Sequence, residues 1–451
     1  MWRRVTARAW DVCLEHFAGL SRPFGRISLR SCNKRGVVTI SVSPAAGLAD
    51  QPAKVAVLGL PPLQEVTLRA LVVNEQGTLF DSCAHYQAGE QGEIDLSGEP
   101  SKGGDYTGLE PMGLFWSLSP AAMEKPYQRL EPRNVKAPMK MEMFVHQGYS
   151  QPDAIPGPVL AKTRVERWFI LPEVRRIRLK EGAVRGSLFL PPGNGPFPGV
   201  IDMFGDEGGL IEYRASLLAT HGFAALSLPY FNFEDLPKAM EDFHLEYFEE
   251  AVRLLLRHPK VKGPGIGVVG TGKGAELASS MMTFLPEVVA AVCISGCSSI
   301  IATAVHYGKI TLPGLRFNMS RVNISESGVF DIYEALDDPM DPANSHCRIP
   351  FEKAEGHFLF VVGEEDRHWK SSSYAEIAIG YLRQHGKNNF TLLSYSGAGH
   401  RINPSFTPVC LVALDRVLGV PILGGGGSRA HAHAQEHSWR KILEFLQFHL
   451  R

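Results

Sequence analysis

The chain has 451 residues, of which 44% are hydrophobic and 21% are charged, and its formal net charge is −1 at pH 7. This length predicts two or three domains, and the composition is typical of a globular protein with a large core. A net charge so close to zero gives no general attraction to polyanions, so we expect no nucleic-acid partner.

The seven cysteines are scattered from Cys13 to Cys410 without the spacing of a disulfide framework, which favours a reducing compartment. Cys293 and Cys297 have no C-x-x-C pair or His set nearby, so we expect no metal site and no cofactor. The uncharged run 288–305 is long enough to raise the question of a membrane span. Because it is rich in Ser, Gly, Ala and Thr, we interpret it as a buried strand with its exit loop and expect no membrane span.

The first 35 residues are strongly basic, with only Asp11 and Glu15 as acidic side chains. An Arg-rich, Ser-containing and acid-poor N-terminus is typical of a mitochondrial transit peptide. Residues 1–36 are therefore predicted to be a transit segment, which implies a mitochondrial protein. The alternative interpretation is a disordered basic tail on a cytoplasmic protein.

Residues 37–170 have the pattern of an all-β sandwich domain. Short runs of β-branched or alternating apolar residues are separated by Gly-containing turns at the spacing expected of a sandwich. The predicted strands are Val55–Leu58, Val66–Val73, Thr78–Phe80 and Met139–Val145. No cluster of candidate catalytic residues stands out in this part of the chain.

Residues 171–451 alternate strands with helices, which predicts an α/β domain built on a mostly parallel sheet. The predicted strands are 184–190, 199–204, 224–228, 266–269, 290–294, 358–362 and 390–394. The predicted helices are 212–221, 238–257, 275–282 and 436–450.

The run Gly270-Thr-Gly-Lys-Gly274 joins a predicted strand to a predicted helix. Such a Gly-rich turn fits the G-x-S-x-G elbow that carries the nucleophile of α/β-hydrolases, but its central residue is Gly272. The same stretch, 267–273, matches the phosphate-binding pattern G-x-x-x-x-G-K, although Gly274 stands where that motif needs Ser or Thr for Mg²⁺. A plain Gly-rich turn is the third interpretation.

Two residues further along the chain favour the hydrolase interpretation. In α/β-hydrolases the acid and then the His follow the nucleophile in chain order. Asp366 comes directly after a predicted buried strand, and His400 follows the next strand on a Gly-containing loop. A phosphate-binding loop would want an Asp at the end of a following strand, whereas the weak candidate Asp202 precedes the loop.

The chain resembles the acyl-CoA thioesterase family that also contains bile acid-CoA:amino acid N-acyltransferase. The resemblance covers nearly everything from about Val42 to Leu450. Its most specific stretches are Gly108–Leu114, Pro196–Gly205, Glu212–Leu218, Glu234–Lys238, His244–Glu250, Ala398–His400 and Gly425–Gln435.

The resemblance implies a C-terminal α/β-hydrolase domain preceded by an all-β sandwich domain. It also implies hydrolysis of fatty acyl-CoA to free acid and CoA, within fatty acid and lipid metabolism. Family members use a Ser, or a Cys in the N-acyltransferase branch, with an Asp and a His. These roles fall on Gly272, Asp366 and His400, so the nucleophile position has no side chain.

The resemblance also implies two donors for the oxyanion hole, namely the backbone N–H of Lys273 and the loop around Phe204 and Gly205. Lys273 matches the thioesterase side of the family, which favours water over an amino acid as the acyl acceptor. The hypotheses left open are a weak thioesterase, an acyl-CoA-binding pseudoenzyme, an acyl-CoA:amino acid N-acyltransferase and, on a different line, a nucleotide-binding protein.

Overall fold

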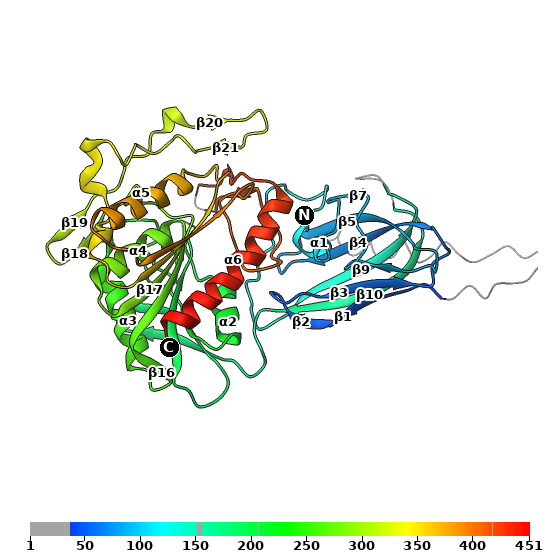
Figure 1. Ribbon diagram of the computed structural model, residues 1–451, viewed down its shortest axis with the longest axis horizontal. Coiled ribbons are helices and arrows are strands. Elements are labelled where there is room, and N and C mark those ends of the chain that lie inside the picture. The colour runs from blue at the N-terminus through cyan, green and yellow to red at the C-terminus, as the bar shows by residue number, and fades with distance from the viewer. Residues whose placement is uncertain (1–36, 151–155, 206, 417) are drawn as a thin grey trace, which may run out of the picture. The chain divides into compact units, whose positions relative to one another are not determined.

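Figure 1 shows the computed structural model, which describes residues 37–150, 156–205, 207–416 and 418–451. The predicted transit segment 1–36 lies outside the described residues. Residues Val38–Arg451 form one compact unit. The division predicted between residues 170 and 171 therefore stays a prediction.

The first strands form two sheets that share a core. Among the described residues, one sheet has the order β1-β3-β6 and the other β2-β10-β9-β4-β5-β7, with β8 paired to β5. The strands are β1 (Thr39–Ser43), β2 (Ala46–Leu48), β3 (Lys54–Leu58), β4 (Glu65–Val73), β5 (Leu79–Gln87), β6 (Ile94–Asp95), β7 (Gly103–Gly104), β8 (Ser119–Pro120), β9 (Met139–Gln147) and β10 (Val159–Trp168).

The buried side chains of the two sheets face each other, as the predicted sandwich requires. Val55 and Val57 of β3 pack in the same apolar cluster as Leu68 of β4 and Met141 of β9. Because successive side chains of a strand point to opposite faces, the alternation of buried residues with exposed or partly buried ones in β3 and β5 marks the face turned away from the core. The short helix α1 (Gly113–Trp116) is buried against this core.

The following strands build a mixed, mostly parallel sheet. In the described chain its order is β11-β12-β14-β13-β16-β17-β22-β23, and only the pairings of β12 with β11 and β14 are antiparallel. The strands are β11 (Arg175–Glu181), β12 (Val184–Leu190), β13 (Phe197–Met203), β14 (Ala224–Ser227), β16 (Val261–Thr271), β17 (Val288–Ile294), β22 (His357–Gly363) and β23 (Phe390–Tyr395).

Helices cover both faces of this sheet (Figure 1). The helices α3 (Leu245–Arg257), α4 (Lys273–Phe284) and α5 (Ser371–Gln384) share one apolar cluster with Val268. The helices α2 (Tyr213–Thr220) and α6 (Ser428–His449) pack with the neighbouring Val269 on the opposite face. The second half of β16, residues 266–271, is therefore buried on both sides. The α/β-hydrolase fold predicted from the sequence is confirmed.

Two helices begin far from the predicted residue. The helix expected over 238–257 begins at Leu245, because Phe243 and His244 form the strand β15, which pairs with β18 (Val305–Tyr307). The helix expected over 436–450 begins earlier, at Ser428. Its first turns carry buried polar residues such as His431 and Gln435, so apolar periodicity does not reveal them.

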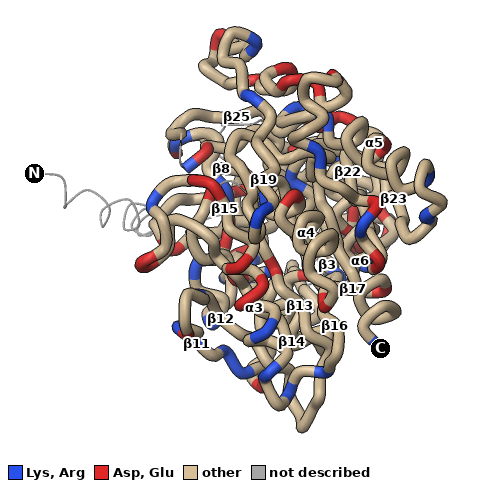
Figure 2. The backbone as a smooth tube through the Cα atoms, turned by 90° about the vertical axis from the view of Figure 1, so that its left-hand side faces the viewer, with Lys and Arg blue, Asp and Glu red and all other residues tan. Residues whose placement is uncertain are grey.

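The interpretation of the uncharged run 288–305 is confirmed, since β17 occupies its first half and a loop follows. In the part of the chain that the structure describes, no helix has the length and apolar character needed to span a membrane. After β17 the chain leaves the large sheet and forms an excursion, which contains the short strands β19 (Ile310–Leu312), β20 (Asn323–Ile324) and β21 (Phe330–Asp331). The strand β21 pairs with β25 (Pro421–Leu423), and β25 pairs with β24 (Val412–Leu414). Figure 2 shows acidic and basic residues intermixed along the described chain.

Candidate active site

Gly272 stands at the sharp turn between β16 and α4, with φ 57° and ψ −120°. This positive φ is a conformation that L side chains rarely adopt and glycine adopts without steric cost. The turn is also too tight for a larger residue at its flank, because a Cβ on Gly270 would stand 2.1 Å from the carbonyl oxygen of Gly274. The predicted elbow is therefore present as a tight strand-to-helix turn.

Asp366 and His400 lie beyond the carboxyl ends of β22 and β23, and the structure brings them into contact. The ring Nδ1–H of His400 donates to Oδ2 of Asp366 at 2.8 Å. The backbone N–H groups of His368 and Trp369 donate to the other carboxylate oxygen, at 2.8 and 3.2 Å. Both side chains of the pair are buried. The carboxylate therefore fixes the tautomer and the orientation of the imidazole.

The free nitrogen of His400 faces the elbow. A Cβ on Gly272 would stand 3.6 Å from Nε2 of His400 and 3.6 Å from Cζ2 of Trp369, both ordinary contact distances. The indole N–H of Trp369 donates to the carbonyl of Ser295 at 2.7 Å, which holds the ring in place. The three residues expected to share a site, Gly272, Asp366 and His400, are thus adjacent.

Burial is the main influence on the pKa of His400, and it lowers this pKa from the ordinary value of 6.5. The carboxylate of Asp366 acts in the opposite direction, while the neighbouring imidazole of His368 and the guanidinium of Arg401 lower the pKa further. A neutral imidazole is the form that can accept a proton. The environment therefore favours the neutral imidazole, and the role of His400 as a general base stays a prediction.

The loop after β13 lies beside the elbow, as the oxyanion-hole prediction requires. A Cβ on Gly205 would stand 3.9 Å from the backbone nitrogen of Lys273. The hydroxyl of Tyr230 donates to the carbonyls of Phe204 and Gly205, which anchors the loop from below. Lys273 is the first residue of α4, where backbone N–H groups have no acceptor within the helix. The role of Lys273, Phe204 and Gly205 in an oxyanion hole stays a prediction.

Thr271, the hydroxyl nearest to Gly272 in the chain, is held in a buried ion-pair network. Arg214 donates to Oγ1 of Thr271 at 2.6 Å and to Oδ1 of Asp202 at 2.5 Å. Arg214 also lies over the ring of Phe204, with 4.1 Å from its guanidinium carbon to the ring centroid. Asp202, the weak candidate for a metal-binding carboxylate, is thus the buried counter-ion of Arg214.

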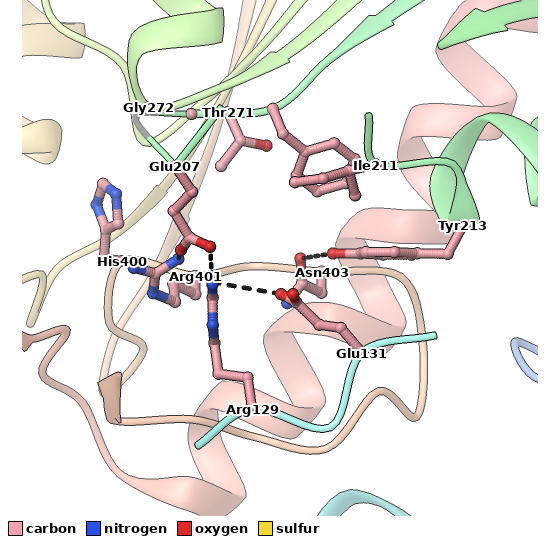
Figure 3. A pocket seen from close by; sticks show the side chains of 12 residues that line it. Arg129, Glu131, Glu207, Ile211, Tyr213, Thr271, Gly272, His400, Arg401 and Asn403 are labelled. Carbon is pink, nitrogen blue, oxygen red and sulfur yellow. Dashed lines mark hydrogen bonds and ion pairs between the residues drawn. The ribbon is translucent and has the colours of Figure 1, made fainter. Parts of the chain in front are cut away.

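Gly272 and His400 line a small cavity of about 30 Å³ (Figure 3), called the polar cavity below because most of the residues in its wall are polar or charged. Its wall includes charged residues from distant parts of the chain. Glu207, on the loop after β13, pairs with Arg129 and, at 2.8 Å, with Arg401, and Arg129 also pairs with Glu131. Sequence reasoning missed Arg129 and Glu131, because it found no candidate cluster before residue 171 and nothing local signals a contact across more than seventy residues.

A second, larger cavity of about 330 Å³ has Lys273, the first residue of α4, in its wall. Most of its wall is apolar and comes from the excursion after β17 and from β25, for example Phe317, Ile332 and Ile422. Lys273, His368 and Trp369 form the part of the wall nearest to the site. The residues 312–336 carried no signal in the sequence, because the excursion lacks long periodic elements.

Comparisons with known proteins agree with this architecture. The family model described as "BAAT / Acyl-CoA thioester hydrolase C terminal" matches residues 243–451, and "Acyl-CoA thioester hydrolase/BAAT N-terminal region" matches residues 50–181. Human mitochondrial acyl-coenzyme A thioesterase 2 is 47% identical over 92% of this chain and 85% of its own length.

Two further relatives represent both branches of the family. Human acyl-coenzyme A thioesterase 1 is 47% identical over 91% of this chain and 97% of its own length. Mouse bile acid-CoA:amino acid N-acyltransferase is 46% identical over 91% of this chain and 97% of its own length. With near-complete coverage at this identity, the chain belongs to the family of acyl-CoA thioester hydrolases and bile acid-CoA:amino acid N-acyltransferases.

Proposed function

We propose that this protein binds fatty acyl-CoA and hydrolyses its thioester slowly, using water activated by His400 in place of a side-chain nucleophile. The observation that carries the proposal is the orientation of His400, whose Nδ1 is bonded to Asp366 while Nε2 faces the point above Gly272. This is the arrangement of a general base in Ser-His-Asp hydrolases. Relatives named as acyl-coenzyme A thioesterases supply the substrate class.

The small polar cavity supports water as the attacking group. A cavity needs roughly 10–15 Å³ of probe-occupied volume and two or more polar partners to hold a water molecule. The volume beside Gly272 is about 30 Å³, and Thr271, His400 and Asn403 contribute to its wall. Because Gly272 has no side chain, a water molecule in this cavity has direct access to Nε2 of His400.

The apolar cavity supports a fatty acyl group as the part of the substrate that is bound. Its lining is predominantly hydrophobic, and its volume of about 330 Å³ lies within the range of ligand pockets. Each methylene group that leaves water for such a cavity contributes about 0.8 kcal/mol. Lys273 belongs to the wall of this cavity, so a chain inside it brings its thioester to the start of α4.

The chemistry then proceeds in a single displacement. Nε2 of His400 takes a proton from water while the water oxygen forms a bond to the thioester carbon. The charge that develops on the carbonyl oxygen is stabilised by backbone N–H groups, for which we propose Lys273 and the loop of Phe204 and Gly205. The C–S bond breaks, and His400 returns the proton to the CoA thiolate. No acyl-enzyme forms.

The expected rate is low. Hydrolases that lose a triad member retain on the order of 10³–10⁴-fold acceleration over water, which comes from the oxyanion hole and from binding. A second candidate function, acyl-CoA binding without turnover, is favoured by the same glycine. The two candidates differ only in whether the bound thioester is cleaved.

The test combines binding and turnover. Titration calorimetry with palmitoyl-CoA, on the time scale before hydrolysis, is expected to show binding by both the natural chain and His400→Ala. Release of free CoA thiol is expected for the natural chain, at a rate above the uncatalysed rate, and at a clearly lower rate for His400→Ala, which keeps only the oxyanion hole and the binding site. Equal thiol release by both proteins would refute His400 as the base. Binding of ATP with Mg²⁺, and none of palmitoyl-CoA, would refute the proposal as a whole.

The acyl acceptor and the cell compartment are part of the proposal. We expect water as the acceptor, so adding glycine or taurine to the assay should yield no N-acyl product.

We expect the mitochondrion as the compartment, with the cytoplasm as the alternative. A fusion of residues 1–36 to a fluorescent protein should reach mitochondria, and a diffuse cytoplasmic signal would contradict this.

We also propose residues 37–170 and 171–451 as two domains, which limited proteolysis near residue 170 would reveal.

A further inference from the structure

One buried carboxylate joins the two loops that the proposed mechanism uses. Glu207 lies on the loop after β13, two residues beyond Gly205, and 5% of its side chain is exposed. Its Oε1 accepts a hydrogen bond from Nη1 of Arg401 at 2.8 Å, and Arg401 directly follows His400 in the chain (Figure 3). The loop proposed for the oxyanion hole is therefore joined to the loop of the base by an ion pair.

Each of the two loops is also held by a hydrogen bond of its own. The hydroxyl of Tyr230, in the segment that follows β14, donates to the carbonyl of Gly205 at 2.7 Å. The hydroxyl of Ser295, which directly follows β17, donates to the carbonyl of His400 at 2.7 Å. These bonds attach each loop to the chain beyond a strand of the large sheet, but neither bond connects one loop with the other. That connection comes from the ion pair.

A third part of the chain restrains the same carboxylate. Arg129 lies between β8 and β9 of the sandwich, and 8% of its side chain is exposed. It pairs with Oε2 of Glu207 and, at 3.3 Å, with Glu131 (Figure 3). Burial lowers the pKa of Arg129 to about 10, so the guanidinium keeps its charge at neutral pH. Glu207 is therefore held by two cations that come from different parts of the chain.

We propose that Glu207 is a positioning residue, whose carboxylate holds the loop of Phe204 and Gly205 where it can serve the same carbonyl group as His400. The inference rests on the proposed function, since that function assigns the oxyanion hole to this loop and the base to His400. The inference also gives the sandwich part of the chain a role in the reaction, because Arg129 fixes the carboxylate. Neither the triad pattern nor a sequence motif points to Glu207.

The physical basis is that the two loops must act on one carbonyl group. Water at Nε2 of His400 attacks the carbonyl carbon, while backbone N–H groups of the Phe204 loop receive the charge of the carbonyl oxygen. A misplacement of about 1 Å in such a site lowers the rate by about 10²-fold. Charge-assisted hydrogen bonds are about twice as strong as neutral ones, and burial protects them from screening by salt. An ion pair in the interior is therefore suited to fix the distance between the loops.

The variant Glu207→Gln keeps nearly the same shape and removes the charge. Its amide oxygen can accept from one guanidinium, but its NH₂ group then faces the other guanidinium, so the bridge opens on one side. Glu207 lines the polar cavity and does not belong to the described wall of the apolar one, so we expect binding of an alkyl chain to be unaffected. The matched control is Glu110→Gln. Glu110 is also a buried carboxylate between two basic side chains, Arg429 and His433, but it belongs to the described wall of neither cavity.

The experiment measures kcat for palmitoyl-CoA from thiol release by the full chain at about pH 8, where the lowered pKa of His400 keeps its ring neutral. Titration calorimetry with hexadecyl-CoA, a thioether that cannot be hydrolysed, gives the Kd. We expect Glu207→Gln to lower kcat by about 10- to 100-fold and to leave the Kd within about twofold. Glu110→Gln should lower the thermal unfolding temperature to a similar extent but keep kcat within about twofold. When Glu207→Gln is combined with Arg401→Gln, kcat should fall no further than in the less active of the two single variants, because both remove the same contact.

Three kinetic results would overturn the inference: a natural kcat in Glu207→Gln, an equal loss of kcat in Glu110→Gln, or additive losses in the double variant. Hydrogen exchange followed by mass spectrometry gives a test that does not depend on turnover. Peptides that contain Phe204 or His400 should exchange faster in Glu207→Gln than in Glu110→Gln, and equal exchange in the two variants would also overturn the inference. Absence of thiol release above the uncatalysed rate from the natural chain would instead refute the proposed hydrolysis, and hydrogen exchange would then decide whether Glu207 holds the two loops together.

Discussion

The Nε2 atom of His400 lies 3.6 Å from the point that a Cβ atom on Gly272 would occupy. A serine side chain extends one bond beyond its Cβ, so a hydroxyl at this position would come within hydrogen-bonding distance of the imidazole. The base, its orienting carboxylate and the turn are thus arranged around an atom that this chain lacks.

The first prediction restores that atom. Gly272→Ser should increase the rate of palmitoyl-CoA hydrolysis by at least about 10²-fold, because an acyl-enzyme route becomes available. Gly272→Ala is the matched control, since it adds the same Cβ without a hydroxyl. The backbone at φ 57° should cost both variants about 1–3 kcal/mol of stability. Equal rates in both variants would show that the nucleophile position lies elsewhere. Thiol release and thermal unfolding measure the two effects.

The second prediction concerns the carboxylate. In the Gly272→Ser background, Asp366→Asn should reduce kcat by about 10⁴-fold, because an amide at the Oδ2 position no longer selects the tautomer in which Nε2 of His400 is free. The KM for palmitoyl-CoA should change little, since Asp366 does not reach the acyl cavity. Glu364→Gln, on the same loop but bonded to Ser394, is the control and should leave kcat unchanged. A large loss in the control would point to the loop and not to the carboxylate.

The third prediction is the pH dependence of hydrolysis. His400 acts as a base only when neutral, and burial lowers its pKa below 6.5. The rate should therefore be constant above about pH 6.5 and fall as the pH drops through the lowered pKa. The same shift means that the folded state loses stability on the acid side, where the buried ring must take up a proton. Initial rates of thiol release across this range check the prediction, and an acid limb centred above pH 6.5 would contradict it.

The fourth prediction tests the buried network under the elbow. Arg214→Leu removes the partner of Asp202 and leaves a carboxylate uncompensated in the interior, which should cost about 3–5 kcal/mol of unfolding free energy. Arg253→Ala, which breaks an exposed pair with Glu249, should cost less than about 1 kcal/mol. Urea denaturation compares the two. Similar losses would mean that Asp202 relaxes to another partner.

Sequence reasoning placed Gly272, Asp366 and His400 in one site, and the structure brings them together, because each follows a strand end and parallel strands bring their loops to one edge of the sheet. It did not find Arg129, Glu207 or His368. Arg129 reaches the site from the β-sandwich part of the chain, and no local pattern records such a contact. His368 is two residues from Asp366, and no pattern in the sequence indicates that the fold buries its ring against His400.

The same limit applied to the helix ends. Apolar periodicity identified the middle of α3 and the end of α6, where one face packs on the sheet. It failed at the start of α3, because the strand pairing of Phe243 with Val305 competes with the helix. It failed at the start of α6, where His431 donates to the carbonyl of Arg401 and accepts from the backbone of Gly399. Tertiary hydrogen bonds decided both boundaries.

The last prediction tests the acyl cavity by chain length. Because each buried methylene contributes about 0.8 kcal/mol, the Kd for alkyl-CoA thioethers should fall about fourfold per added methylene until the cavity is filled. Val420→Trp, which places a large ring in the wall, should abolish the gain for the longer chains and leave ethyl-CoA binding unchanged. Val159→Trp, an exposed position on β10, is the control and should preserve the full series. If the Kd in the natural protein does not change with alkyl chain length, the assignment of this cavity to the acyl group is contradicted. If the Kd still falls with chain length in Val420→Trp, the alkyl chain lies along another wall of the cavity.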